Sequence, residues 1–128
     1  MDENQIIITT PQELKKYIGK LVVTHYGGVY SSFEESLRVL HSIKDSNGKE
    51  LKDSNISLNY CHVYGQFILR RKKSDKTFES YFCTTTRPLY SDNVDYVRLP
   101  TTEEKHEFME RLTKYNIENN VMHIVWNN

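Results

Sequence analysis

The residue types with the clearest chemical potential in this chain are five cations gathered between positions 70 and 76. Guanidinium and ammonium groups bind phosphates and carboxylates. Aromatic side chains, whose rings can stack on unpaired bases, lie close to them in the sequence. The pattern predicts an anion-binding site that consists of Arg70, Arg71, Lys72, Lys73 and Lys76, flanked by Tyr60, Tyr64, Phe67 and Tyr81.

The same cations also have a structural interpretation, as the solvated tip of a hairpin. Lysine near a strand end discourages edge-to-edge pairing of sheets. Alternation along a strand sends Arg70 and Lys72 to one face, and Arg71 and Lys73 to the other, so the cations cannot all serve one groove. Both hypotheses, solvation and binding to phosphates or an acidic protein surface, stay open at this point.

Metal and thiol chemistry find less support in the sequence. None of the five histidines has the spacing of a zinc site, and we expect His25 and His62 to be structural. Cys61 and Cys83 form no CxxC motif, so we expect reduced thiols. We predict no metal site and no cofactor.

Acid–base chemistry lacks an obvious pair of carboxylates. Glu34-Glu35 and Glu103-Glu104 both stand where capping of a helix start would explain them. An active site needs placed titratable groups, and none stand out. We therefore predict that the protein is not an enzyme and has no catalytic residue.

The elements that must position the cations are two arms of a β-hairpin. β-prone residues cover Gln66–Arg71 and Thr77–Thr85, on either side of the polar residues 73–76. Apolar alternation and β-branched residues predict further strands in the same chain. These are Ile6–Ile8, Leu21–Tyr26, Ile56–Tyr64, Val94–Arg98 and Val121–Trp126.

Two helices have start signals. Thr10 and Pro11 begin a helix that ends at Gly19. Thr101 and Glu104 form a capping box before a stripe that we expect to be buried, made of Phe108, Met109, Leu112 and Tyr115. The apolar residues within 32–43 fit both the helical and the strand periodicity. The capping box of Ser32 with Glu35, and Leu40, which interrupts the strand alternation, favour a helix.

The elements together predict an α+β fold, with a mainly antiparallel sheet of about five or six strands and two or three helices packed on one face. The 128 residues suit a single domain, 1–128. Its 17 basic and 17 acidic residues balance, which argues against binding of long DNA by charge alone. No apolar run reaches the length of a membrane span or a signal, so we expect a cytoplasmic protein without a membrane partner.

The segment Leu99–Leu112, with its T-x-E-E-K pattern and helical apolar stripe, resembles a helix of small accessory proteins from Bacteroidetes and their phages. The resemblance covers the C-terminal quarter of the chain, and the chain departs from the pattern at Tyr115-Asn116-Ile117. It implies a short phage or mobile-element protein. Such proteins are often inhibitors of host defence, including anti-CRISPR proteins.

These observations lead to one expected function and one alternative. The first is a non-enzymatic, phage-encoded inhibitor of a host defence nuclease, whose basic hairpin contacts a protein partner such as an RNA-guided nuclease, or its guide RNA. The alternative is a small RNA- or nucleotide-binding module without an inhibitory role.

Overall fold

The computed structural model describes residues 6–27, 32–40, 42–44, 62–64, 67–82, 87–88 and 94–119. Its elements follow in chain order. They are β1 (Ile7–Ile8), α1 (Pro11–Lys15), β2 (Leu21–Tyr26), β3 (Phe33–Val39), β4 (Ser42–Lys44), β5 (His62–Tyr64), β6 (Phe67–Lys72), β7 (Phe78–Phe82), β8 (Arg87–Pro88), β9 (Val94–Arg98) and α2 (Thr102–Glu118).

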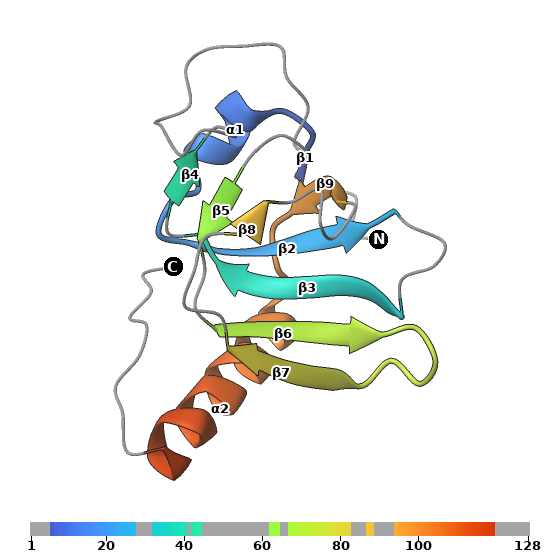
Figure 1. Cartoon of the computed structure of the whole chain (residues 1–128), viewed down its shortest axis with the longest axis vertical. Helices are drawn as coiled ribbons and strands as arrows, with labels where there is room; N and C mark the ends of the chain where they lie inside the picture. Colours follow the sequence, from blue (N-terminus) through green and yellow to red (C-terminus); the bar gives the residue numbers. More distant parts are fainter. Residues whose placement is uncertain are drawn as a thin grey trace.

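Most strands join one antiparallel sheet. Its six strands stand in the order β1-β9-β2-β3-β6-β7, and a separate three-stranded sheet has the order β4-β5-β8 (Figure 1). The α+β class and the antiparallel six-stranded sheet confirm the prediction, with two helices among the described residues. The helices were predicted on one face, but α1 and α2 pack on opposite faces of the sheet. No helix in this part of the chain is long and apolar enough to cross a membrane.

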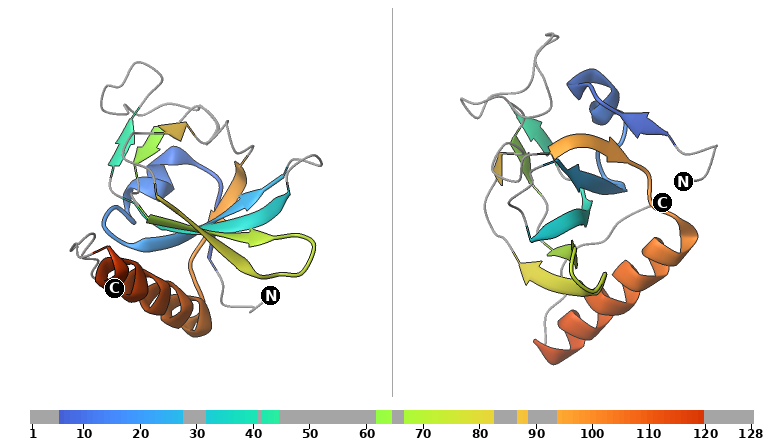
Figure 2. Two further views of the ribbon diagram at one scale, coloured as in Figure 1. Left: turned by 60° about the horizontal axis from the view of Figure 1, so that its bottom comes forward. Right: turned by 90° about the vertical axis from the view of Figure 1, so that its right-hand side faces the viewer.

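Each face of the main sheet carries its own apolar cluster. Phe108 and Leu112 of α2 pack on one face, against Leu21, Val23, Leu37, Val39, Phe67 and Leu69 (Figure 2). Leu14 of α1 belongs to the other cluster, with Ile8, Val22, Tyr26, Leu40, Val94 and Val97. Burial of two faces explains why β2 is apolar at successive positions.

Both helices begin at their predicted capping residues, but α1 ends earlier than predicted. The Thr10 hydroxyl accepts a hydrogen bond from the Glu13 amide at 3.4 Å. The helix α1 ends at Lys15, and Gly19 takes its left-handed φ of +88° in the turn that follows. At α2, the Glu104 amide donates to the Thr101 hydroxyl, and the Thr101 amide donates to the Glu104 carboxylate. Met109 differs from its prediction, because 49% of it is exposed and it lies outside the buried stripe.

The helix favoured for residues 32–43 is wrong, because residues 33–39 form the central strand β3. This strand pairs with β2 on one side and β6 on the other, with Leu37 opposite both Val23 and Leu69. Pairing on both sides outweighs a local capping signal. Leu40, which spoiled the alternation, lies just past the strand end, where its carbonyl accepts a hydrogen bond from Gly19.

Several other predictions fall partly or wholly outside the described residues. Only the last three residues of the predicted strand Ile56–Tyr64 are described, as β5. The hairpin arms are present as β6 and β7. The predictions for Tyr60, Cys61, Cys83 and the strand Val121–Trp126 lie wholly outside the described residues.

Candidate functional site

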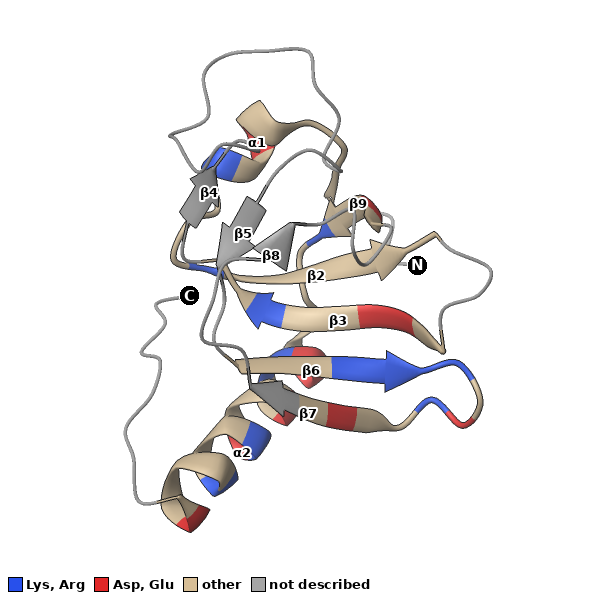
Figure 3. Cartoon of the chain, in the orientation of Figure 1, with Lys and Arg blue, Asp and Glu red and all other residues tan. Residues whose placement is uncertain are grey.

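The basic cluster lies on β6 and on the turn that follows it. In Figure 3, the cationic end of β6 runs between acidic stretches of its two neighbours, β3 and β7. Arg70 is opposite Glu79 in the register, and its Nη2 donates to Glu79 Oε1 at 2.9 Å. Its guanidinium also lies 4.3 Å from the centre of the Phe33 ring. Arg70 is therefore engaged by neighbours within the sheet.

Arg71 is engaged on the other face, as strand alternation predicts. Its guanidinium donates to Glu35 Oε1 at 3.1 Å and to Glu104 Oε2 at 3.2 Å. It also lies 4.9 Å from the centre of the Phe78 ring. Both arginines are thus neutralised by the protein's own carboxylates, which counts against their use as a grip on an outside anion.

Lys72 ends β6, and Lys73 and Lys76 lie in the turn that follows. The Lys72 amide donates to the Thr77 carbonyl at 2.8 Å across this turn, and the Lys73 amide donates to the Ser32 carbonyl at 3.0 Å. Asp75 accepts hydrogen bonds from the hydroxyl and amide of Thr77, which lower the pKa of its carboxyl. Lys76 forms an ion pair of 2.7 Å with Glu34, while 63% of its side chain stays exposed.

The predicted stacking surface does not form around Phe67. This side chain is 1% exposed, and its ring packs against Phe108 and Tyr115 at centroid distances of 5.6 and 5.4 Å. The strand alternation that turns Arg71 toward α2 also turns Phe67 toward it, so its ring is closed to a base. Tyr64 lies in β5 and Tyr81 in β7, where the backbone alone is described.

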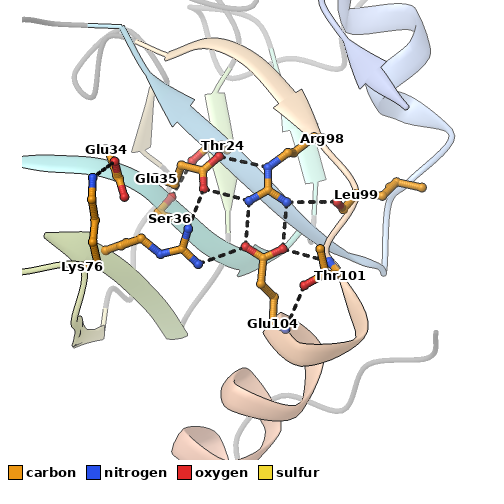
Figure 4. A network of polar contacts seen from close by, with 10 residues as sticks. Thr24, Glu34, Glu35, Ser36, Lys76, Arg98, Leu99, Thr101 and Glu104 are labelled. Carbon is orange, nitrogen blue, oxygen red and sulfur yellow. Dashed lines mark hydrogen bonds and ion pairs between the residues drawn. The ribbon is translucent and has the colours of Figure 1, made fainter. Parts of the chain in front are cut away.

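A buried charge network joins the sheet to the start of α2 (Figure 4). Arg98 donates to Glu35 through Nε and Nη2, at 2.9 and 2.7 Å, and to Glu104 through Nη1 and Nη2, at 2.8 and 2.7 Å. All three side chains are 10% exposed or less. With Arg71, two arginines face two glutamates, so the charges of the four groups sum to zero.

The network holds Glu104 ionised. Burial raises the pKa of the Glu104 carboxyl, but hydrogen bonds from Arg98 and the Thr101 amide, with the charges of Arg98 and Arg71, outweigh burial and lower it below 4.5. Burial likewise opposes the charge of Arg98, and the hydrogen bonds to Glu104 and Glu35 outweigh it, so the pKa of Arg98 is raised.

We predict that acid weakens the fold through Glu104. Because its pKa is lower in the folded chain than in the unfolded chain, its contribution is present above about pH 4.5 and is lost as the pH falls through the folded pKa. Urea unfolding between pH 7 and pH 3 measures the loss. In Glu104→Gln, the free energy of unfolding should fall less steeply between pH 7 and pH 3 than in the wild type. Parallel curves of unfolding free energy against pH for the two proteins would contradict the prediction.

Sequence patterns alone did not reveal this network. Glu35 and Glu104 were both explained as capping residues, which is correct for Glu104 alone. The network depends on β3 being a strand, because Glu35 then lies on the same face as Arg71, its partner in the register. The one available signal was the run of strand-compatible alternation in residues 33–43.

A second polar group lies on the opposite face of β2 and β3. The hydroxyls of Thr24 and Ser36 are hydrogen-bonded to each other, and Arg38 Nη2 donates to Ser36 at 2.8 Å. Arg38 is 2% exposed, so it is a buried structural cation.

A histidine, His25, is opposite Glu35 of the charge network in the register of β2 and β3. His25 Nδ1 is 2.8 Å from Asp95 Oδ1, and its ring stacks on Tyr96 with centroids 4.5 Å apart. These contacts match the expectation of a structural histidine. Burial, with the charges of Glu35 and Asp95, raises the pKa of Tyr96. A general base would need a converging nucleophile or substrate pocket, which these contacts do not supply.

Gly27 makes room for the carboxylate that orients His25. A Cβ at this position would lie 3.1 Å from Asp95 Oδ2. We predict that Gly27→Ala shifts the Asp95 carboxylate by a few tenths of an ångström and weakens its contact with His25. The cost should stay below about 1 kcal/mol because the pair is partly exposed. The NMR shifts of the His25 ring should move as they do in Asp95→Asn. Unchanged shifts would contradict the prediction.

Within the described ranges, no group of three or more histidine, cysteine or acidic side chains is placed to hold a metal ion. Comparison of the chain with protein-family models, with curated proteins and with solved structures finds no match. The case for a function therefore depends on the chain's own geometry.

Proposed function

We propose that this protein is a non-enzymatic binding protein that uses the lysines of the β6–β7 turn, Lys72, Lys73 and Lys76, to contact an acidic surface of a protein partner. The resemblance of its C-terminal helix extends the proposal to a phage-encoded inhibitor of a host defence nuclease. The lysines, rather than the arginines, carry the contact, because Lys73 and Lys76 are exposed, whereas Arg70 and Arg71 are half-buried against Glu79, Glu35 and Glu104. Lys76 also binds Glu34, but 63% of its side chain stays exposed.

The observation that carries the proposal is the backbone conformation of Lys76. Its φ of +63° is the one positive φ among the described non-glycine residues. Glycine or asparagine fills such a position at lower steric cost, and backbone strain gathers at functional sites. A lysine held in this conformation, at the end of a hydrogen-bonded turn that extends beyond β3 (Figure 1), suits a contact residue.

A protein partner is favoured over RNA for two reasons. Phe67 is buried, so one of the four candidate rings for base stacking is lost. The chain is also neutral overall, which weakens attraction to a long polyanion.

The test uses substitutions that separate binding from folding. Lys76→Gly removes the charge and the steric strain together, so the free energy of unfolding should stay within about 1 kcal/mol of the wild type. Lys73→Glu reverses an exposed charge. We expect the pair to abolish protection of phage from an RNA-guided nuclease in cells. The matched control, Lys16→Glu with Lys20→Glu, changes two exposed lysines near α1 and should keep full protection.

The same variants test the alternative. Fluorescence anisotropy with a short single-stranded RNA would give a salt slope of about −2 if three lysines met phosphates. If the wild type binds RNA with this slope and the Lys73 and Lys76 variants do not, the partner is RNA and not a protein. Full phage protection by folded Lys73→Glu/Lys76→Gly protein would overturn the proposal, since the lysines would then only solubilise the turn.

A further inference from the structure

Among the described residues, no strand lies beyond β7, which pairs with β6 alone and ends the sheet. Natural sheets protect their edges with short strands, charged side chains (lysine above all), proline or bulges. The opposite edge, β1, is two residues long, whereas β7 has five residues, Phe78–Phe82, with neither lysine nor proline and no shift in its register with β6. Its one charge, Glu79, is paired with Arg70 within the sheet, so little in the described residues protects this edge.

The helix α2 overhangs this edge. Tyr115 packs on Phe67, which is opposite Phe82 at the end of β7, so the last residues of α2 lie beyond that point. Figures 1 and 2 both show the C-terminal end of α2 extending past β7. An added strand would extend the sheet beneath this end of the helix.

We propose that the added strand is β7 of a second copy of this chain, paired antiparallel about a two-fold axis at Ser80. In this register Phe78 of one copy is opposite Phe82 of the other. Glu79 is opposite position 81, so the two glutamates do not meet, and each is already neutralised by Arg70 at 2.9 Å. The strand is thus complementary to itself in charge, as an isologous interface requires.

The two overhanging helices also fit this arrangement. Each α2 crosses the junction at the Phe82 end of its own β7, which is the Phe78 end of the other. Four residues of strand separate the two crossings by roughly 13 Å at 3.4 Å per residue. A helix is about 10 Å wide with its side chains, so the two can lie side by side on one face of a continuous sheet.

A charge-swap experiment tests the dimer directly. Sedimentation velocity of the full chain should show a monomer–dimer equilibrium that depends on concentration. Ser80→Lys and Ser80→Glu place like charges opposite each other at the axis, so each variant alone should be monomeric. Their mixture should form a heterodimer, because the two charges then attract. Ser80 is exposed, so both variants should fold.

A cross-linking variant keeps the outcome decisive. Ser80→Cys, with Cys61 and Cys83 replaced by serine, should cross-link two copies on oxidation, since opposed Cα atoms about 5 Å apart suit a disulfide.

A wild-type monomer at every concentration, without a heterodimer from the charge pair, would overturn the proposal. If removal of residues 120–128 then produced the dimer, the edge would be covered by the chain's own C-terminus. If Ser80→Lys instead abolished phage protection by a monomeric protein, the edge would belong to the partner. Neither result tests the lysines of the β6–β7 turn, so the dimer proposal and the proposed function can fail separately.

Discussion

Replacing Arg98 with methionine should lower the free energy of unfolding by about 3–5 kcal/mol, as expected when one partner of a buried ion pair is removed. Arg98 makes four hydrogen bonds to Glu35 and Glu104, and the glutamate side chains are 10 and 7% exposed. Without Arg98, Arg71 alone faces two buried carboxylates. The remaining carboxylates must then take up protons, draw in water or pull α2 away from the sheet.

Urea unfolding at pH 7 measures this loss, with Arg111→Ala as the control. Arg111 forms a partly exposed ion pair with Glu107 one helical turn away, so its loss should cost less than about 1 kcal/mol. A comparable loss in both variants would mean that burial of the Arg98 network contributes little.

The double variant Arg98→Met, Glu35→Gln sharpens the interpretation. Without Arg98, Arg71 faces two carboxylates, and the second substitution leaves one cation with one carboxylate, Glu104. The double variant should therefore recover a large part of the loss. If instead it is less stable than Arg98→Met alone, the hydrogen bond between Arg71 and Glu35 matters more than the charge that was removed.

The sequence predicts the fold best where one local pattern acts alone. Thr101 and Glu104 fix the start of α2, and Thr10 with Pro11 fixes the start of α1, because each depends on neighbours within a few positions. The prediction for residues 33–39 was wrong because this segment fits both the helical and the strand periodicity. The strand is selected by its pairing with β2 and β6, and a local sequence pattern carries no information on where those strands lie.

The candidate site shows a sharper limit. Arg70, Arg71, Lys72 and Lys73 are consecutive and chemically similar, yet the two arginines are half-buried while Lys73 lies exposed in the turn. The arginines bind Glu79, Glu35 and Glu104, which stand 9 to 36 positions away in the sequence. Counting cations therefore locates the hairpin, but it overstates how many cations remain to bind a partner.

Phe67→Ala should lower the free energy of unfolding by about 3–5 kcal/mol, because truncation of a buried aromatic ring leaves a cavity. Phe67 is 1% exposed and packs edge-on against Phe108, which is 0% exposed. The ring lies where β6 meets α2, so the cavity would loosen the contact between sheet and helix. Thermal or urea unfolding of the variant gives the loss.

The exposed Met109, which follows Phe108 directly, provides the control for this prediction. Met109→Ala removes an apolar side chain of similar size from the same helix, and it should cost less than about 0.5 kcal/mol because it leaves no cavity. If Phe67→Ala proved as mild as Met109→Ala but abolished binding of single-stranded RNA, Phe67 would be a stacking residue after all. A large loss of stability would instead exclude the ring from the surface, and with it one of the supports for RNA binding.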